Sequence, residues 1–180
     1  MKYILVFPTL LLAICSNAQL YKNKDKGLDV SFFSETPMEN INATTNKVSS
    51  LINFQTDSIV LRISNTDFKF KNSLMEEHFN ENYMESEKYP LSVFRGKFDQ
   101  KIDPKKAGVY KVKAKGFLEM HGVRQNREIS GTIEIKEGVK IHSEFMVKLV
   151  DHKIEVPKLV FEKIAESIKI TIDGQYVFFK

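Results

Sequence analysis

The sequence predicts an all-β protein, a single antiparallel up-and-down barrel of about eight strands with one amphipathic helix inserted near residues 72–85. Three observations predict this fold: segments in which apolar and polar residues alternate, turn residues between those segments, and one stretch with helical spacing. The 180 residues are 42% hydrophobic and 28% charged. This composition suits one globular domain that is long enough to bury a sizeable core.

The N-terminus, residues 1–18, is expected to be a signal peptide. A lysine precedes an apolar run over residues 4–14, and small residues that end at Ala18 form a cleavage site. Cleavage would leave residues 19–180 as one exported domain, periplasmic or secreted. Two alternatives are a lipoprotein signal that uses Cys15 and an apolar N-terminal strand. The residue before Cys15 is an isoleucine rather than a small residue, which favours cleavage after Ala18.

Alternation with period two locates the strands. In the clearest case, Val112 and Ala114 alternate with Lys111 and Lys113, as in a strand with one buried and one solvated face. Several segments have ten or more residues, which favours a tall barrel over stacked sheets. The predicted strands are 28–34, 46–54, 58–64, 91–99, 112–120, 127–135, 139–149 and 168–178, with an uncertain piece near 40–45.

Helical spacing replaces alternation near residues 72–85, where apolar positions fall on one side and glutamates on the other. Asn72 or Ser73 is expected to cap this helix, with Glu76 in its first turn. A second, short helical turn is expected near residues 157–166, opened by a proline. A helix inserted in a barrel meander usually covers an opening of the barrel.

Two motifs resemble the YceI-like family. The stretch 77–90, which ends in Lys-Tyr-Pro, together with Val93-Phe94 after two intervening residues, resembles the helix of that family and the strand that follows it. The stretch 116–123, Gly-Phe-Leu-Glu-Met-His-Gly-Val, resembles its strand and turn. The resemblance covers about residues 28–180. It implies an extended, lipocalin-like barrel, usually exported, whose members bind polyisoprenoids or other long apolar molecules in an elongated cavity.

Candidate ligand-binding residues follow from alternation, from the helix and from the two motifs. Each of these side chains could instead simply pack in the core, and His121 could bond a turn backbone rather than a ligand head group. The candidates facing the interior are Phe32, Phe54, Leu61, Ile63, Phe94, Phe98, Leu118, Met120, Phe145, Val147, Leu149 and Phe178. The candidates from the helix and the motifs are Leu74, Met75, Phe79, Tyr83, Met84, Tyr89 and His121.

Other functional classes are disfavoured by what the sequence lacks. It has no Gly-rich phosphate loop, no nucleophile elbow and no His-Glu-x-x-His zinc motif, so we expect no enzyme, cofactor or metal. A formal net charge of +4 is too small to indicate nucleic-acid binding. The function expected is sequestration or transport of a long apolar ligand. The alternative is an interaction or stress-protective protein whose barrel is filled by its own side chains.

Lysines gather in one loop and on the outer face of the strand that follows it, namely Lys101, Lys105, Lys106, Lys111, Lys113 and Lys115. Such a run is usually a solvated face. The alternative is transient docking to an anionic membrane, from which a lipid would enter the barrel. A monomer or homodimer is expected.

Overall fold

The computed structural model describes residues 19–37, 40–156 and 165–179. The predicted signal peptide and most of the predicted helical turn at 157–166 lie outside these residues. Within them the protein is all-β with one short α-helix, as the sequence predicts, and with brief 3₁₀ turns at Asn65–Asp67 and Leu149–His152.

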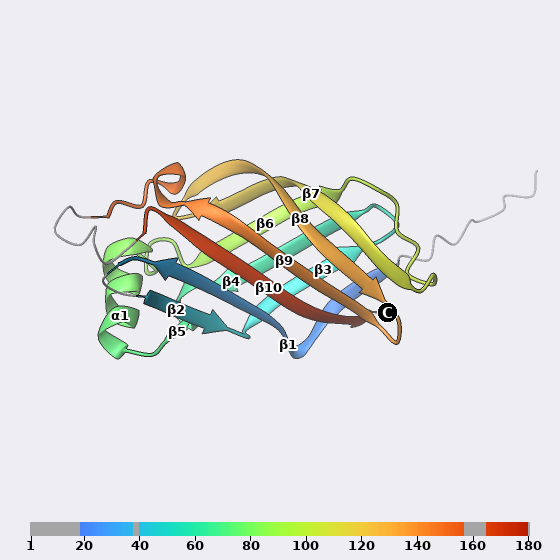
Figure 1. Cartoon of the computed structure of the whole chain (residues 1–180), viewed down its shortest axis with the longest axis horizontal. Helices are drawn as coiled ribbons and strands as arrows, with labels where there is room; N and C mark the ends of the chain where they lie inside the picture. The colour runs from blue at the N-terminus through green and yellow to red at the C-terminus, as the bar shows by residue number, and fades with distance from the viewer. Residues whose placement is uncertain (1–18, 38–39, 157–164, 180) are drawn as a thin grey trace, which may run out of the picture.

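Eight antiparallel strands form a closed barrel (Figure 1). Each strand pairs with its neighbour in the order β10-β9-β8-β7-β6-β4-β3-β1, and β1 pairs with β10 to close the ring. The predicted meander is therefore confirmed. The strands are β1 (Leu20–Glu35), β3 (Val48–Asn53), β4 (Ser58–Ser64), β6 (Leu91–Phe98), β7 (Gly108–Met120), β8 (Val123–Ile135), β9 (Val139–Lys148) and β10 (Ser167–Phe178).

Two further strands extend the sheet beyond the closed ring. The uncertain piece is a strand, β2 (Asn40–Thr45), which pairs with the end of β1 and with β5 (Lys69–Phe70). Strand β1 starts at Leu20, earlier than predicted, and has a register shift between Asn23 and Leu28. Because β1 is this long, it contacts β3 at its start and β2 at its end.

The predicted helix is present in two parts, α1 (Ser73–His78) and the π-helical turn η2 (Phe79–Tyr83). Asn72 caps α1, because its side chain accepts a hydrogen bond of 2.9 Å from the backbone nitrogen of Leu74. Figure 1 places α1 across one end of the barrel.

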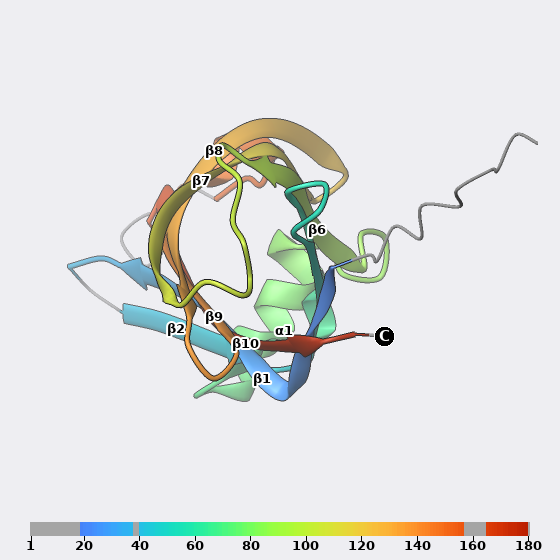
Figure 2. The same cartoon turned by 90° about the vertical axis from the view of Figure 1, so that its right-hand side faces the viewer.

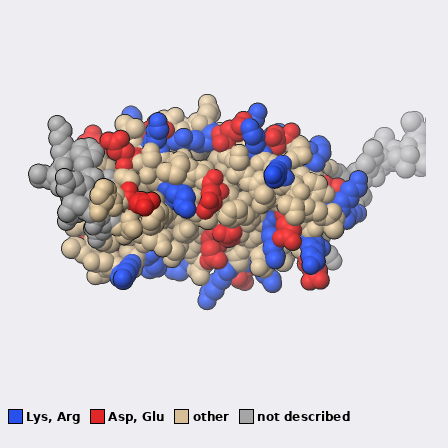
Figure 3. All heavy atoms as spheres, viewed as in Figure 1, with Lys and Arg blue, Asp and Glu red and all other residues tan. Residues whose placement is uncertain are grey.

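The opposite end of the barrel is filled by side chains. Leu28, Ile52, Val139 and Tyr176 are at most 2% exposed, and the Tyr176 hydroxyl donates a 2.7 Å hydrogen bond to the Ser50 hydroxyl. The loop between β6 and β7 crosses this end (Figure 2). Ile102 of this loop is buried in the core, so the loop closes this end of the barrel. The face of the barrel shown in Figure 3 carries charges of both signs, interspersed.

Candidate ligand-binding cavity

The half of the barrel nearer α1 contains a cavity of about 460 Å³. This volume lies in the range of small-molecule sites. Strands β1, β4 and β6 to β10 supply the walls, and α1 and η2 supply the end. Most of the predicted site residues line this cavity: Phe32, Leu61, Ile63, Leu74, Met75, Phe79, Tyr83, Met84, Phe94, Phe98, Leu118, Met120, Phe145, Val147 and Leu149.

The cavity wall is apolar and uncharged. Among the described residues that line it there is no lysine, arginine, aspartate or glutamate. Its polar members are hydroxyl, amide and imidazole side chains. Because burying a charge against such a wall is costly, the cavity suits a molecule whose body is hydrocarbon.

Phenylalanines hold the helical segment against the barrel. The Phe79 ring stacks on Phe32 with centroids 5.4 Å apart, and it also contacts Phe68 and Phe70 at 5.7 and 5.1 Å. Phe68 and Phe70 line the cavity but were not predicted as site residues. Phe68 precedes strand β5 and Phe70 is its last residue, and this two-residue strand is too short to produce an alternation pattern. The cluster therefore closes the cavity end with aromatic surface.

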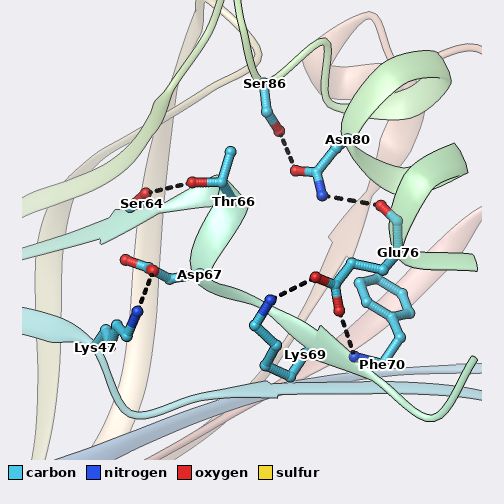
Figure 4. Close-up of polar contacts among 9 residues, drawn as sticks. All are labelled: Lys47, Ser64, Thr66, Asp67, Lys69, Phe70, Glu76, Asn80 and Ser86. Carbon is cyan, nitrogen blue, oxygen red and sulfur yellow. Dashed lines mark hydrogen bonds and ion pairs between the residues drawn. The ribbon is translucent and has the colours of Figure 1, made fainter. Parts of the chain in front are cut away.

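Polar contacts outside the cavity fix the same segment (Figure 4). The Glu76 carboxylate accepts hydrogen bonds from Lys69 Nζ and from the backbone nitrogen of Phe70. The hydrogen bond from Lys69 holds the pKa of Glu76 below its ordinary value. Asn80 donates to the Glu76 carbonyl at 2.9 Å and accepts from the Ser86 hydroxyl at 2.7 Å. Charge thus lies on the outer side of the segment and aromatic surface on its inner side.

One buried polar pair lines the cavity wall. The Ser92 hydroxyl donates to Asn65 Oδ1 at 2.7 Å, and Asn65 Nδ2 donates to the Tyr89 carbonyl. Both side chains are buried. Their hydrogen bonds are made within the protein, so an apolar ligand can lie against them without leaving a polar group unpaired.

His121 and Tyr89, both candidates for ligand contact, are not among the residues that line this cavity. His121 lies in the two-residue β7–β8 turn with a left-handed φ of 52°. Its Nε2 lies 2.7 Å from a Glu85 carboxylate oxygen and its Nδ1 lies 3.1 Å from the His152 carbonyl. The Tyr89 ring contacts the imidazole edge-on at 4.6 Å. Both residues join the segment after η2 to the hairpin tip.

Phe54 and Phe178, also candidates for ligand contact, do not line this cavity. Phe54 is buried at the filled end, 5.2 Å from the Tyr21 ring. Phe178 has the same strand parity as the buried Tyr176 but is 51% exposed. It lies at the end of β10, where the strand extends past the packed core, so alternation no longer means burial.

Acidic neighbours partly neutralise the lysine-rich face. Lys101 pairs with Asp57. Lys113 and Lys115 both pair with Glu128, whose pKa their hydrogen bonds lower. The structure therefore leaves less local positive charge on this face than the sequence indicates.

Over the described ranges, no group of three or more His, Cys, Asp or Glu side chains could hold a metal ion. No helix in the same part of the chain is long and apolar enough to cross a membrane.

The comparisons with known proteins agree on one fold. A family model described as YceI-like domain matches residues 21–176. No curated protein sequence matches the chain. A solved structure of a polyisoprenoid binding domain from Saccharophagus degradans superposes with a TM-score of 0.76 at 11% identity, covering 88% of this chain and 98% of that one.

Two other solved structures are similar. Burkholderia cenocepacia BcnA gives a TM-score of 0.67 at 15% identity, with 82% of this chain and 95% of that chain covered. The Campylobacter jejuni YCEI protein gives 0.60 at 17% identity, with 77% and 84% covered. At these identities the structural likeness establishes the fold.

Proposed function

The chain belongs to the YceI-like domain family, and we propose that it is a binding protein that sequesters or transports a long apolar molecule, a polyisoprenoid or another lipid. The observation that carries this proposal is the uncharged apolar cavity of about 460 Å³ inside the barrel. The similar domain from Saccharophagus degradans is described as polyisoprenoid binding, which supports the same ligand class.

Hydrocarbon burial alone can supply the affinity. Each buried methylene contributes about 0.8 kcal/mol of binding free energy, so ten of them contribute about 8 kcal/mol before the cost of association is subtracted. Binding by this means needs no reaction. The alternative, a barrel filled by its own side chains, fits the half around Tyr176 but not the half that holds the cavity.

Export is the second part of the proposal. The apolar run and small residues before Gln19 support cleavage after Ala18 and a periplasmic or secreted protein. Expression of the full chain in a bacterium, followed by fractionation and intact-mass measurement, tests this. The expected product begins at Gln19 outside the cytoplasm, and a full-length cytoplasmic product would overturn it.

Membrane docking is the third part. Lys105, Lys106 and Lys111 are exposed and could dock transiently to an anionic membrane. Vesicle binding that weakens as salt rises supports the idea, and salt-insensitive or absent binding overturns it. We propose a monomer or homodimer in solution, which sedimentation measures.

Ligand binding is tested with a series of prenols and fatty alcohols of increasing length. Affinity should rise with each added carbon until the cavity is full and then stop rising. A length-independent affinity, or no binding at any length, would contradict the proposal.

A further inference from the structure

The ladder between strands β8 and β9 ends partway along the barrel wall, and the two strands then diverge. In the described structure they pair only from Ile135 and Val139 to Gly131 and Ser143. Beyond that point β8 continues to pair with β7 as far as Val123. Strand β9 likewise continues with β10 to its own end. Figure 1 shows β8 arching away from β9 toward the end of the barrel where α1 lies. We call this separation the fork.

The cavity reaches the fork. Its lining includes Ser130, Gly131 and Thr132 of β8 and His142 and Ser143 of β9. Successive side chains of a strand point to opposite faces, and the buried residues of β8 include Ile129 and Ile133. Ser130 and Thr132 therefore belong to the outer face. The cavity lining therefore includes residues of both strands at the point where their ladder ends.

The fork can admit hydrocarbon at low cost. The lining residues at this point carry hydroxyl groups, an imidazole and no side chain at Gly131. The Ser143 hydroxyl already donates to the Ser130 carbonyl at 2.7 Å. Met146 is 53% exposed on the adjacent stretch of β9. An apolar chain passing here need not displace water from a lysine, arginine or carboxylate of the described lining.

A short 3₁₀ turn, η3 (Leu149–His152), holds the wide end of the fork. Gln125 Nε2 donates to the Asp151 carbonyl at 2.7 Å, and Arg127 Nη2 donates to Asp151 Oδ2 at 2.9 Å. His152 is fully buried, with Nδ1 3.2 Å from the Val123 carbonyl. Side chains make these contacts in place of a strand ladder. We call η3 with these contacts the clasp, and such a connection opens more easily than paired strands.

We propose that the fork between β8 and β9 is the opening through which the apolar ligand enters and leaves, and that the clasp controls how often it opens. This inference rests on the proposed function. Leu149 of the clasp also lines the cavity, so movement of the clasp would widen the fork from inside.

The first test loosens the clasp. The variant Asp151→Asn and its matched control Glu119→Gln each weaken one arginine pair of β8, but Glu119 joins Arg124 to β7 rather than to the clasp. Stopped-flow fluorescence with an anthracene-labelled fatty alcohol measures binding and release. A gate predicts that Asp151→Asn raises both rates about threefold to fivefold at unchanged Kd, whereas Glu119→Gln changes neither. Circular dichroism verifies that both variants are folded.

The second test obstructs the fork. Ser130→Cys, in a full chain whose only natural cysteine is replaced by Cys15→Ser, is labelled with a bulky maleimide. Ser49→Cys on the outer face of β3 and Glu77→Cys on the exposed side of α1, neither of which lines the cavity, receive the same label. Slower uptake and release from the Ser130 label alone support the fork.

The outcomes separate the two claims. If the unmodified protein binds no labelled alcohol, both the proposed function and this inference are overturned. If the protein binds but its rates respond to the Glu77 label and not to the Ser130 label, ligand passes by the helix and the inference alone is overturned. Unchanged rates in Asp151→Asn would overturn the role of the clasp.

Discussion

Replacing Ala114 by phenylalanine should partly fill the cavity and shorten the ligand that fits. Ala114 lies on β7 between Phe98 and Ile129 of the neighbouring strands and lines the cavity. A benzene-sized group fills a space of about 150 Å³, about a third of the 460 Å³ present. It would displace about five methylenes of a chain that fills the cavity. At about 0.8 kcal/mol each, this is about 4 kcal/mol, or about a thousandfold in Kd.

Chain length and stability are the readouts for this variant. Long prenols should lose affinity, while alcohols at least five carbons shorter, by the same estimate of about 0.8 kcal/mol per methylene, should keep theirs. Ala43→Phe is the matched control, since Ala43 is 1% exposed but does not line the cavity. Urea unfolding should show a loss of about 1–3 kcal/mol for Ala43→Phe and a smaller loss for Ala114→Phe. Equal losses, or an unchanged chain-length profile, would refute the reasoning.

Three further predictions separate stability, pH and charge from ligand binding. Tyr176→Phe removes the hydrogen bond to Ser50 at the filled end, so it should lower the unfolding free energy by about 1 kcal/mol and leave ligand affinity unchanged; a loss of affinity would contradict the division of the barrel. Burial lowers the pKa of His152 below its ordinary value of 6.5, so the unfolded chain takes up the proton more readily and stability should fall as pH drops below about 6.5. Chemical denaturation at several pH values should find this fall reduced in His152→Gln and retained in His142→Gln, and an equal fall in both variants would refute it. Glu128→Gln frees two lysines, so it should strengthen salt-sensitive binding to anionic vesicles, and vesicle binding as weak as in the unmodified protein would count against docking by this face.

The strands could be predicted because the outer face of the barrel sheet contacts water and the inner face does not. The prediction fails where inward positions are polar. Strand β8 extends back to Val123, although its half-buried positions there include Gln125 and Arg127, which bind the clasp. A polar residue at an inward-facing position interrupts the alternation of apolar and polar residues from which the strand is predicted. The same contacts could not be foreseen, because Asp151 lies more than twenty residues away in the sequence.

The cavity itself could not be derived from alternation. A pattern states which residues face inward, but whether they meet across the barrel depends on the path of each strand. Tyr176 and Phe145 both face inward by pattern, yet Tyr176 fills its end of the barrel and Phe145 lines the cavity. The partners of His121 could not be predicted either, because Glu85 and His152 belong to segments that are distant from it in the sequence.

The content of the barrel tests the central claim most directly. The protein, purified from a bacterial periplasm, would be weighed by mass spectrometry under native and denaturing conditions, and its organic extract analysed for lipids. The account predicts an apolar compound at about one molecule per chain that is lost on denaturation, or tight uptake of added prenols by an empty protein. A protein that is empty and also refuses prenyl and acyl chains would contradict it.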